Sequence, residues 1–400
     1  MTLKFYPAKH NSLFIWMWQH LNFLELSTKV KLNILPSEVK TLRSFSPNTG
    51  SILIANHSDE LDPRVCMELS RRSGRRFTFM VNSEVYKEWF GITRWCLQFI
   101  GSFSVERGAF DQVAIKYAIN TVKQSNETLV MFPEGEISNL NDSVQTFKPG
   151  VAHIGLEAIQ EVSRVSPNWT VYVLPVAIKY RYRKNIGSTL RKRITRMEQH
   201  LAMHSNALGI RDELYCIMNR LKESSMGTDD TETEIMKVDV LIDQLQKTRE
   251  SIISEIENKY HDPIKSHGDL LSRTQKMIFF LREQINKKEF FTTATQKQFK
   301  DDLKALKDTI AMATWQPQYI ELNPSEERLA ETVIKLEKVV FHKRRPPALG
   351  KREAFVRLLE PIDLSAWLAA YKEDPSTTSK NIAEELRAKI QQSILNMRNL

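Results

Sequence analysis

Short apolar segments alternate with helix-like segments between residues 51 and 180, and this alternation constrains the fold more than any other feature of the chain. Each apolar segment has the length of a buried strand, and the segments between them have the periodicity of amphipathic helices. Parallel strands need such crossover helices, so the pattern predicts an α/β fold with a mostly parallel sheet covered by helices. The expected strands are 51–55, 77–81, 103–105, 128–132 and 170–179, and the expected helices are 62–72, 110–123 and 151–162.

Beyond Tyr182 the strand signal disappears, and one helical pattern follows another as far as Arg345. One of these patterns has apolar residues close to the heptad spacing of packed helices, namely Ile235, Val238, Ile242, Leu245, Ile252 and Ile256. A strand-like segment at 354–359 and a polar helix from Ser379 then close the chain. We therefore expect a large helical bundle inserted into the α/β core. The expected parts are an N-terminal interfacial, amphipathic segment (1–45), the core (46–183), the inserted bundle (184–345), and a final strand and C-terminal helix that return to the core (346–400).

The N-terminal segment carries the strongest apolar cluster, residues 13–18, which Gln19 and His20 interrupt. No run approaches the roughly 20 apolar residues that a membrane-spanning helix needs, so no transmembrane helix is expected. Phe14, Trp16 and Trp18 suit a segment that lies among lipid headgroups. A helix packed on the domain core explains the same residues equally well.

The net charge of +9 suits an anionic partner, either nucleic acid, an anionic lipid surface or a charged acyl donor. Basic runs occur at 71–76, 179–184 and 191–193, and attraction to anionic headgroups explains them without the nucleic-acid motif that the sequence lacks. A solvated surface is the plain alternative. The three cysteines have no CxxC spacing, which argues against a zinc site, and no metal is expected.

His57 and Asp62 form the first candidate for catalysis, because His57 leaves an expected strand and Asp62 stands where the next helix begins. The Asp62 carboxylate would accept the proton of one imidazole nitrogen, which leaves the other nitrogen to take a proton from an attacking hydroxyl. Taken alone the spacing is weak, since Asp62 is also well placed as a simple N-cap, with Pro63 as the first helical residue.

Three further segments contain residues that are candidates for the site or its support. Arg107 follows the expected strand 103–105 and could grip a phosphate with two hydrogen bonds. Glu134 and Gly135 form a tight turn at the carboxyl end of strand 128–132, where open α/β sheets bind ligands, and Lys148 precedes the next helix. Pro175 interrupts an apolar strand and would mark a sheet edge or a bulge.

The order and spacing of these four segments resemble the four signature motifs of the glycerolipid acyltransferase family, which includes glycerol-3-phosphate and 1-acylglycerol-3-phosphate acyltransferases. The resemblance covers about residues 50–180. It implies that His57 is the general base and Asp62 its orienting acid, in a motif that also contains Asn56. It further implies that Arg107 binds the phosphate of the acceptor and that Glu134 and Gly135 shape the acceptor pocket, while the place of Lys148 before a helix suits one more anion contact. Asn56 and Pro175 would position the reacting groups.

The sequence departs from the family pattern at three positions. Asp59 and Glu60 stand where the family often has a serine and a bulky apolar residue, and Ile137 stands where the third motif usually has an arginine. Loss of that arginine removes one phosphate contact, which Lys148 or the basic run near 181–193 would have to replace.

The resemblance implies an O-acyltransferase of phospholipid biosynthesis, which moves a fatty acyl group from acyl-CoA or acyl carrier protein to a glycerolipid hydroxyl. No cofactor is implied beyond this acyl donor, and the protein would lie on the cytoplasmic face of a membrane as a peripheral enzyme. Two alternatives remain open: a thioesterase or lysolipid hydrolase, in which water replaces the acceptor, and a non-catalytic lipid-binding protein.

Overall fold

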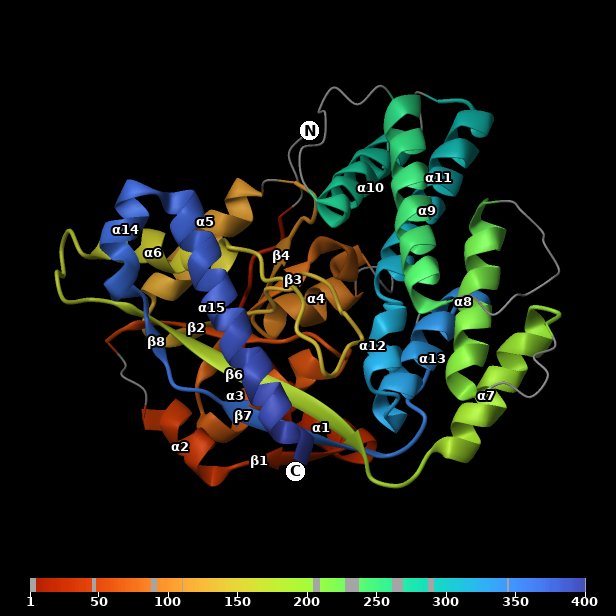
Figure 1. The fold of residues 1–400 in the computed structure, drawn as a ribbon. Helices are drawn as coiled ribbons and strands as arrows, with labels where there is room; N and C mark the ends of the chain where they lie inside the picture. Colours follow the sequence, from red (N-terminus) through yellow and green to blue (C-terminus); the bar gives the residue numbers. More distant parts are fainter. Residues whose placement is uncertain are drawn as a thin grey trace. The chain divides into compact units, whose positions relative to one another are not determined.

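The computed structural model describes residues 5–44, 48–87, 92–109, 111–203, 209–226, 237–260, 269–286, 291–343 and 345–399. The chain divides into two compact units. Unit 1 contains Met1–Glu106, Phe110–Arg181 and Arg352–Leu400, and unit 2 contains Arg107–Ala109 and Tyr182–Lys351. Each unit is described by itself (Figure 1).

Unit 1 is built on one eight-stranded, mostly parallel sheet, which confirms the predicted fold class. Seven strands follow the order β1-β7-β6-β2-β5-β3-β4, and the short β8 pairs with β6 in the antiparallel sense. The strands are β1 (Val30–Ile34), β2 (Gly50–Ala55), β3 (Arg76–Asn82), β4 (Ser102–Val105), β5 (Glu127–Met131), β6 (Val171–Tyr182), β7 (Arg352–Leu358) and β8 (Ile362–Asp363).

Helices cover both faces of this sheet, because alternate residues of the central strands are apolar in both directions (Figure 1). Ile52 and Ile54 of β2 point to one face, and Leu53 and Ala55 point to the other. The helices of unit 1 are α1 (Ser12–Lys29), α2 (Pro36–Ser44), α3 (Asp62–Ser73), α4 (Ile92–Phe99), α5 (Gln112–Lys123), α6 (Gly150–Val162), α14 (Leu368–Glu373) and α15 (Pro375–Asn396).

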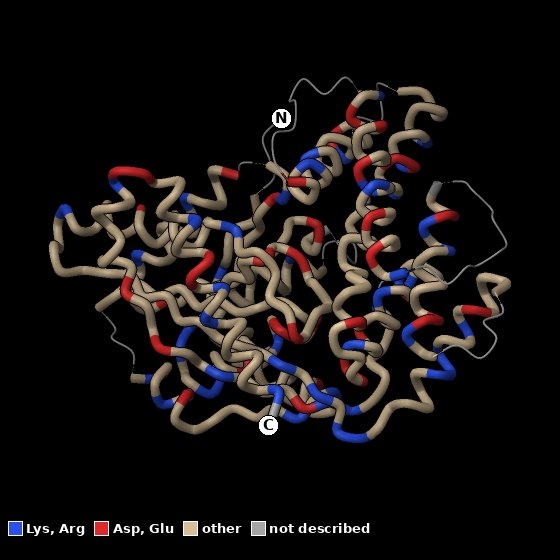
Figure 2. The backbone as a smooth tube through the Cα atoms, in the orientation of Figure 1, with Lys and Arg blue, Asp and Glu red and all other residues tan. Residues whose placement is uncertain are grey.

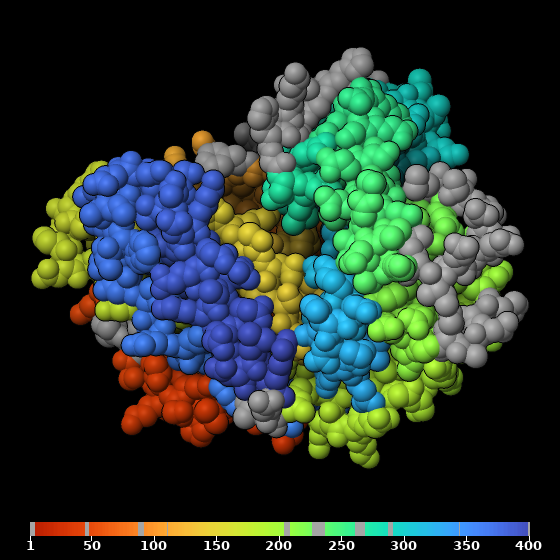
Figure 3. All heavy atoms as spheres, viewed as in Figure 1, coloured from red at the N-terminus to blue at the C-terminus, as the bar shows by residue number. Residues whose placement is uncertain are grey.

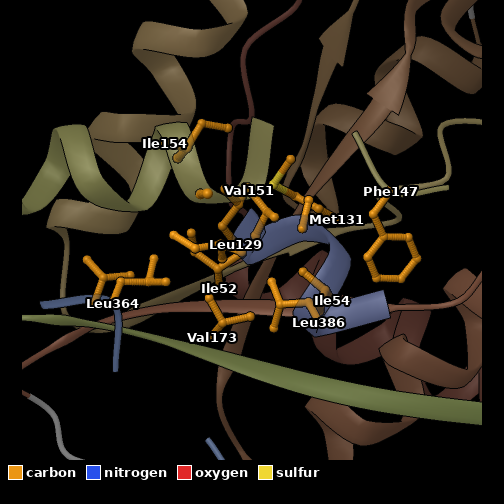
Figure 4. Close-up of a cluster of buried hydrophobic side chains, with 14 of the residues drawn as sticks. Ile52, Ile54, Leu129, Met131, Phe147, Val151, Ile154, Val173, Leu364 and Leu386 are labelled. Atoms are coloured by element: carbon orange, nitrogen blue, oxygen red, sulfur yellow. The ribbon is translucent and has the colours of Figure 1, made fainter. Parts of the chain in front are cut away.

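Helices α5, α6 and α15 bury the first face of the sheet, where Val151 and Leu386 close over the β2 side chains (Figure 4). Helices α1, α2 and α3 bury the second face, with Leu26, Leu42 and Val65 in its core. β2 ends at Ala55, and Asn56 and His57 of the first motif follow directly.

The N-terminal residues differ from the expectation of a separate segment over 1–45. β1 pairs in parallel with β7 from Val30↔Arg352 to Ile34↔Val356, so it forms the edge of the main sheet. α1 packs on the sheet through Leu26, and Phe14 and Trp18 contact the same core. The packing of α1 is the alternative that the sequence left open, a helix on the domain core, whereas the short strand β1 that follows α1 directly was not expected.

The C-terminal helix α15 lies against the segment that follows β5 (Figure 3). The Gln391 side chain accepts a hydrogen bond from the Val144 backbone N–H at 2.8 Å and donates one to the Asp142 carbonyl at 3.0 Å. α15 therefore holds in place the long connection between the third-motif turn and α6.

The described residues of unit 2 after Tyr182 form helices and their connections, and the predicted insertion, 184–345, lies within the range of unit 2. Acidic and basic residues intermix along these helices (Figure 2), as on solvated helical surfaces. The helices are α7 (Gly187–His200), α8 (Ile210–Met226), α9 (Val238–Lys259), α10 (Leu270–Asn286), α11 (Thr293–Ala313), α12 (Pro317–Leu322) and α13 (Glu326–Val340).

The predicted heptad seam lies on α9, but its register differs from the expected one. Leu245 and Ile256 are buried as expected, whereas Ile242 and Ile252 are half-buried and Leu241 and Ile253 take the buried positions. Ile235 lies outside the described residues. A straight helix of 3.6 residues per turn drifts against a strict heptad, which explains why buried positions shift between its two ends.

Candidate active site

His57 follows the central strand of the parallel sheet. β2 lies between β6 and β5, with Ile54 paired to Pro175 on one side and to Met131 on the other. The carboxyl ends of these three strands therefore meet at one edge, and the loop that begins at Asn56 leaves from its middle. This is where open α/β sheets present their functional loops.

The His57 ring and the Asp62 carboxylate are in direct contact. His57 Nδ1 lies 3.1 Å from Asp62 Oδ2, and only 10% of the His57 side chain and none of that of Asp62 is exposed. With Nδ1 donating to the carboxylate, the Nε2 lone pair is left to accept a proton. Among the described residues, no hydrogen bond engages Nε2. The two residues predicted as base and orienting acid are thus brought together in the geometry that this chemistry needs.

The expectation that Asp62 is the N-cap of α3 is wrong. Leu61 occupies the N-cap position without a side-chain cap, and Asp62 is the first helical residue. Its Oδ2 atom accepts a hydrogen bond from the Asp59 backbone N–H at 2.9 Å, and its Oδ1 atom accepts one from the Tyr180 hydroxyl at 2.7 Å. The carboxylate turns away from the helix because these inward donors and the His57 ring occupy both of its oxygens.

Burial raises the pKa of Asp62, while its hydrogen bonds with the His57 ring and the Asp59 N–H act in the opposite direction. Burial also raises the pKa of Tyr180, with the neighbouring Asp62 and Asp59 charges adding to the effect, so its hydroxyl stays a proton donor. A buried carboxylate is costly unless it is hydrogen-bonded. The three donors around Asp62 provide that compensation.

The third-motif turn holds the backbone of His57 on both sides. Glu134 Oε1 accepts a hydrogen bond from the His57 N–H at 2.6 Å, and the Ser138 N–H donates to the His57 carbonyl at 2.8 Å. Glu134 Oε2 accepts from the Gln145 N–H at 3.2 Å. Both oxygens of this buried side chain are therefore engaged within the chain, which makes Glu134 a residue that positions His57. Its contact with an acceptor stays a prediction.

Gly135 has a positive φ of 77°, which an L side chain rarely adopts. A Cβ atom at this position would also lie 2.9 Å from Lys148 Cε and Nζ. The exposed Lys148 side chain therefore runs directly over the Gly135 backbone. The glycine is needed both for the turn and for this close approach.

Asn56 and Asn141 continue the pairing of β6 after β2 has ended at Ala55. The Asn56 side chain accepts from the Ile178 N–H at 2.8 Å and donates to the Ile178 carbonyl at 2.9 Å. Asn141 does the same at Tyr180, with both distances 2.7 Å. The two amides replace the missing strand, so that β6 continues as far as Tyr180 beside the His57 loop.

Pro175 was expected at an edge or a bulge, and the structure contradicts this. It lies inside β6, which has β2 and β7 as neighbours. Its carbonyl accepts a hydrogen bond from the N–H of Leu359, which follows β7. A strand residue directs its N–H and C=O to the same side, so the N–H that Pro175 lacks would have faced the side of Leu359. The ladder with β2, on the other side, is therefore not interrupted and continues past Ile54.

Arg107 follows β4 by two residues and belongs to unit 2, so no distance from it to His57 is defined. Ile137 is half-buried and precedes Ser138 in the third-motif turn, which forms hydrogen bonds with the His57 backbone. The predicted phosphate contacts of Arg107 and Lys148 stay predictions. Among the described residues, no three histidine, cysteine, aspartate or glutamate side chains gather as a metal site would require.

Sequence reasoning missed four residues around the site: Tyr180, Ser138, Asn141 and Arg352. Tyr180 was readable from strand alternation, because it shares the parity of Leu174 and Val176, which face the α3 side of the sheet. It lay within a basic run that was attributed to the membrane instead. No local pattern indicated that Arg352 belongs to the site, because the whole sequence of unit 2 separates Arg352 from Tyr180.

Residues 36–179 match the model of a protein family described as Acyltransferase. They are an acyltransferase-family domain. This acyltransferase domain begins with α2 and includes every residue of the His57 site up to Lys179. The chain is also similar to a protein of Streptococcus pneumoniae named 1-acyl-sn-glycerol-3-phosphate acyltransferase, with 36% identity over 84 residues. That alignment covers 21% of this chain and 30% of the relative's length. Both findings support the glycerolipid acyltransferase family that the four motifs of the domain indicate.

Proposed function

We propose that this protein is an O-acyltransferase that moves a fatty acyl group from an acyl thioester to a hydroxyl of a glycerolipid. His57 Nε2 removes the proton of the attacking hydroxyl, the new ester bond forms, and the thiol of the donor leaves with a proton. Asp62 keeps the His57 ring in the required tautomer and stabilises the imidazolium that forms.

One observation carries this proposal: the His57 ring is 3.1 Å from a fully buried carboxylate, within an acyltransferase-family domain. The ring also stacks on Phe132, with the ring centroids 4.3 Å apart. This contact and the backbone bonds of Glu134 and Ser138 limit the rotation of His57, as a general base requires.

The acceptor we propose is a 1-acylglycerol-3-phosphate or a closely similar lysolipid. The name of the Streptococcus pneumoniae relative supports this choice. Lys148, which is exposed beside the Gly135 turn, is our candidate for the phosphate contact that Ile137 does not supply. Arg107 is the second candidate, because it follows the carboxyl end of β4.

The test uses the purified full chain with acyl-CoA or acyl carrier protein as the donor, a panel of lysolipids and glycerol-3-phosphate, and mass detection of products. We expect acylated lipid, and we expect His57→Gln to lower the rate by about 10² or more. His200→Gln, which replaces an exposed histidine of α7, is the matched control. If free fatty acid were the only product, the protein would be a thioesterase and the proposed acyl transfer would be refuted. If no product depended on His57, only the lipid-binding alternative would remain.

We also propose that unit 1 works on a membrane surface through α1 and α4. Leu13 and Trp16 of α1 are 75% and 58% exposed, and Ile92 and Trp95 of α4 are 64% and 50% exposed. Phe14 connects the two helices, because its ring packs edge-on against Trp95 with centroids 5.1 Å apart. Apolar and aromatic side chains in this setting suit the headgroup zone.

The basic run at 71–76 supports membrane binding less than the sequence suggested. Arg71 and Arg72 both pair with Glu68, and Arg76 lies 3.6 Å from Glu127. Because acidic partners in the same unit offset these charges, the α1 and α4 side chains carry the proposal. In the described part of the chain, no helix has both the length and the apolar character needed to cross a bilayer.

A further inference from the structure

Arg352 connects the end of unit 2 to the His57 loop. It is the first residue of β7 and follows Lys351, the last residue of unit 2. One of its guanidinium nitrogens lies 2.5 Å from Asp59 Oδ2, and only 12% of the Arg352 side chain and 21% of that of Asp59 is exposed. Its guanidinium carbon also lies over the Tyr180 ring, 4.8 Å from the centroid.

The two groups that Arg352 contacts are the ones that hold Asp62. The Asp59 backbone N–H and the Tyr180 hydroxyl donate to the two different oxygens of the Asp62 carboxylate. The Asp59 side chain brings a second negative charge close to Asp62. Without a cation, this charge would oppose the ionised form of a carboxylate that has no exposure to water.

We propose that Arg352 is a positioning residue of the active site, which balances the Asp59 charge and fixes Tyr180 so that Asp62 stays ionised and directed at His57. This rests on the proposed function of His57 as the base. Glu134 and Cys66 are further titratable groups of the described residues whose pKa burial and the Asp62 charge raise.

The arrangement also links the point where the chain leaves unit 2 to the site. The Arg183 N–H donates to the Lys351 carbonyl at 3.0 Å, so a hydrogen bond within unit 2 joins the segments at its two ends. Arg352 comes directly after this junction.

The test removes the two charges one at a time and together. The pH dependence of acyl transfer is measured in Arg352→Met, in Asp59→Asn and in the double variant. In Arg352→Met the unpaired Asp59 charge favours the imidazolium, so the acid limb of the rate profile moves up by about one pH unit and kcat falls about 10-fold or more. In Asp59→Asn the limb moves down, because Asp59 then no longer offsets the positive charge of Arg352. The double variant returns close to the wild-type profile.

The matched control is Glu353→Gln. Glu353 is the next residue after Arg352 in β7, and the substitution breaks its ion pair with Lys31 of β1. It should leave the profile unchanged, because this pair has no contact with the His57 loop. Arg352→Lys keeps the charge and should keep the limb near its wild-type position even if kcat falls.

A second readout does not depend on catalysis. The His57 ring is titrated by NMR in the same variants, with His57→Gln for assignment. Wild-type protein that transfers no acyl group would reject the proposed function, while opposite shifts of the His57 titration would still support the positioning role. Unchanged titration in both single variants, or shifts in the same direction in both, would overturn it.

Discussion

Replacing Glu134 with glutamine tests how burial has altered the site. Burial raises the pKa of Glu134 from its ordinary 4.5 to about 7, although the His57 and Gln145 N–H groups act to lower it. Between these two pH values the folded protein keeps a proton on Glu134 that the unfolded chain has lost. Stability is therefore fully present below about pH 4.5 and decreases as the pH rises through 7.

The size of this effect follows from the change in pKa. A pKa raised from 4.5 to about 7 corresponds to a loss of about 3 kcal/mol in the free energy of unfolding once the carboxylate is ionised. Glu134→Gln cannot titrate, but its amide no longer accepts the Gln145 N–H, which costs about 1–3 kcal/mol at every pH. The stability of the wild type relative to the variant should therefore fall by about 3 kcal/mol from pH 4.5 to pH 8, so that the variant equals or exceeds the wild type at pH 8.

The assay is urea unfolding of the full chain at several pH values, with the wild-type and variant curves subtracted so that all other titrating groups cancel. Glu161→Gln serves as the control, because Glu161 is an exposed glutamate of α6 that pairs with Lys123. Its difference from wild type should stay level across the range. A Glu134→Gln difference that is equally level would refute the conclusion that Glu134 is buried against water.

Three further predictions concern the loops and the surface of unit 1. Asn56→Ala removes two buried hydrogen bonds to β6 and should lower the free energy of unfolding by about 2–5 kcal/mol, measured in urea; a loss below about 1 kcal/mol would contradict the bridging role. Gly135→Ala and Gly74→Ala both place a side chain at positive φ, so each should cost about 1–2 kcal/mol. Only Gly135→Ala should also lower kcat, by about 10-fold, because its new side chain displaces the turn that holds the catalytic loop. Gly74→Ala should leave kcat unchanged, because the space around Gly74 is open. Serine at both Leu13 and Trp16 should weaken sedimentation with anionic vesicles by at least about 10-fold without changing the thermal melt, since both side chains are exposed; equal sedimentation would place the membrane contact elsewhere.

Much of the site was predictable because its parts are short segments at the ends of strands. The spacing of His57 and Asp62 gave the pair, and strand 128–132 placed the Glu134 turn at the same edge of the sheet. What the spacing could not give was the use of each carboxylate. The sequence left open whether Asp62 orients His57 or only caps a helix, and it gave no sign that the Glu134 carboxylate accepts hydrogen bonds from donors inside the chain.

Two of the errors share one physical origin, since they concern strand residues whose partners are distant in the sequence. Pro175 was expected at an edge because nothing local shows that a residue from the C-terminal part completes its side of the strand. The strand β1 was missed because its partner, β7, is separated from it by the whole of unit 2.

The sequence by itself determined the alternation of strands and helices, and with it the parallel sheet, the family and the residues able to act as base and acid. Hydrophobic periodicity and strand ends are local properties, so they can be read along the chain. Only the tertiary structure decided what surrounds the Asp62 carboxylate. Its hydrogen bond with Tyr180 and the pairing of Asp59 with Arg352 join residues more than a hundred positions apart, and such contacts exist only when the sheet has assembled.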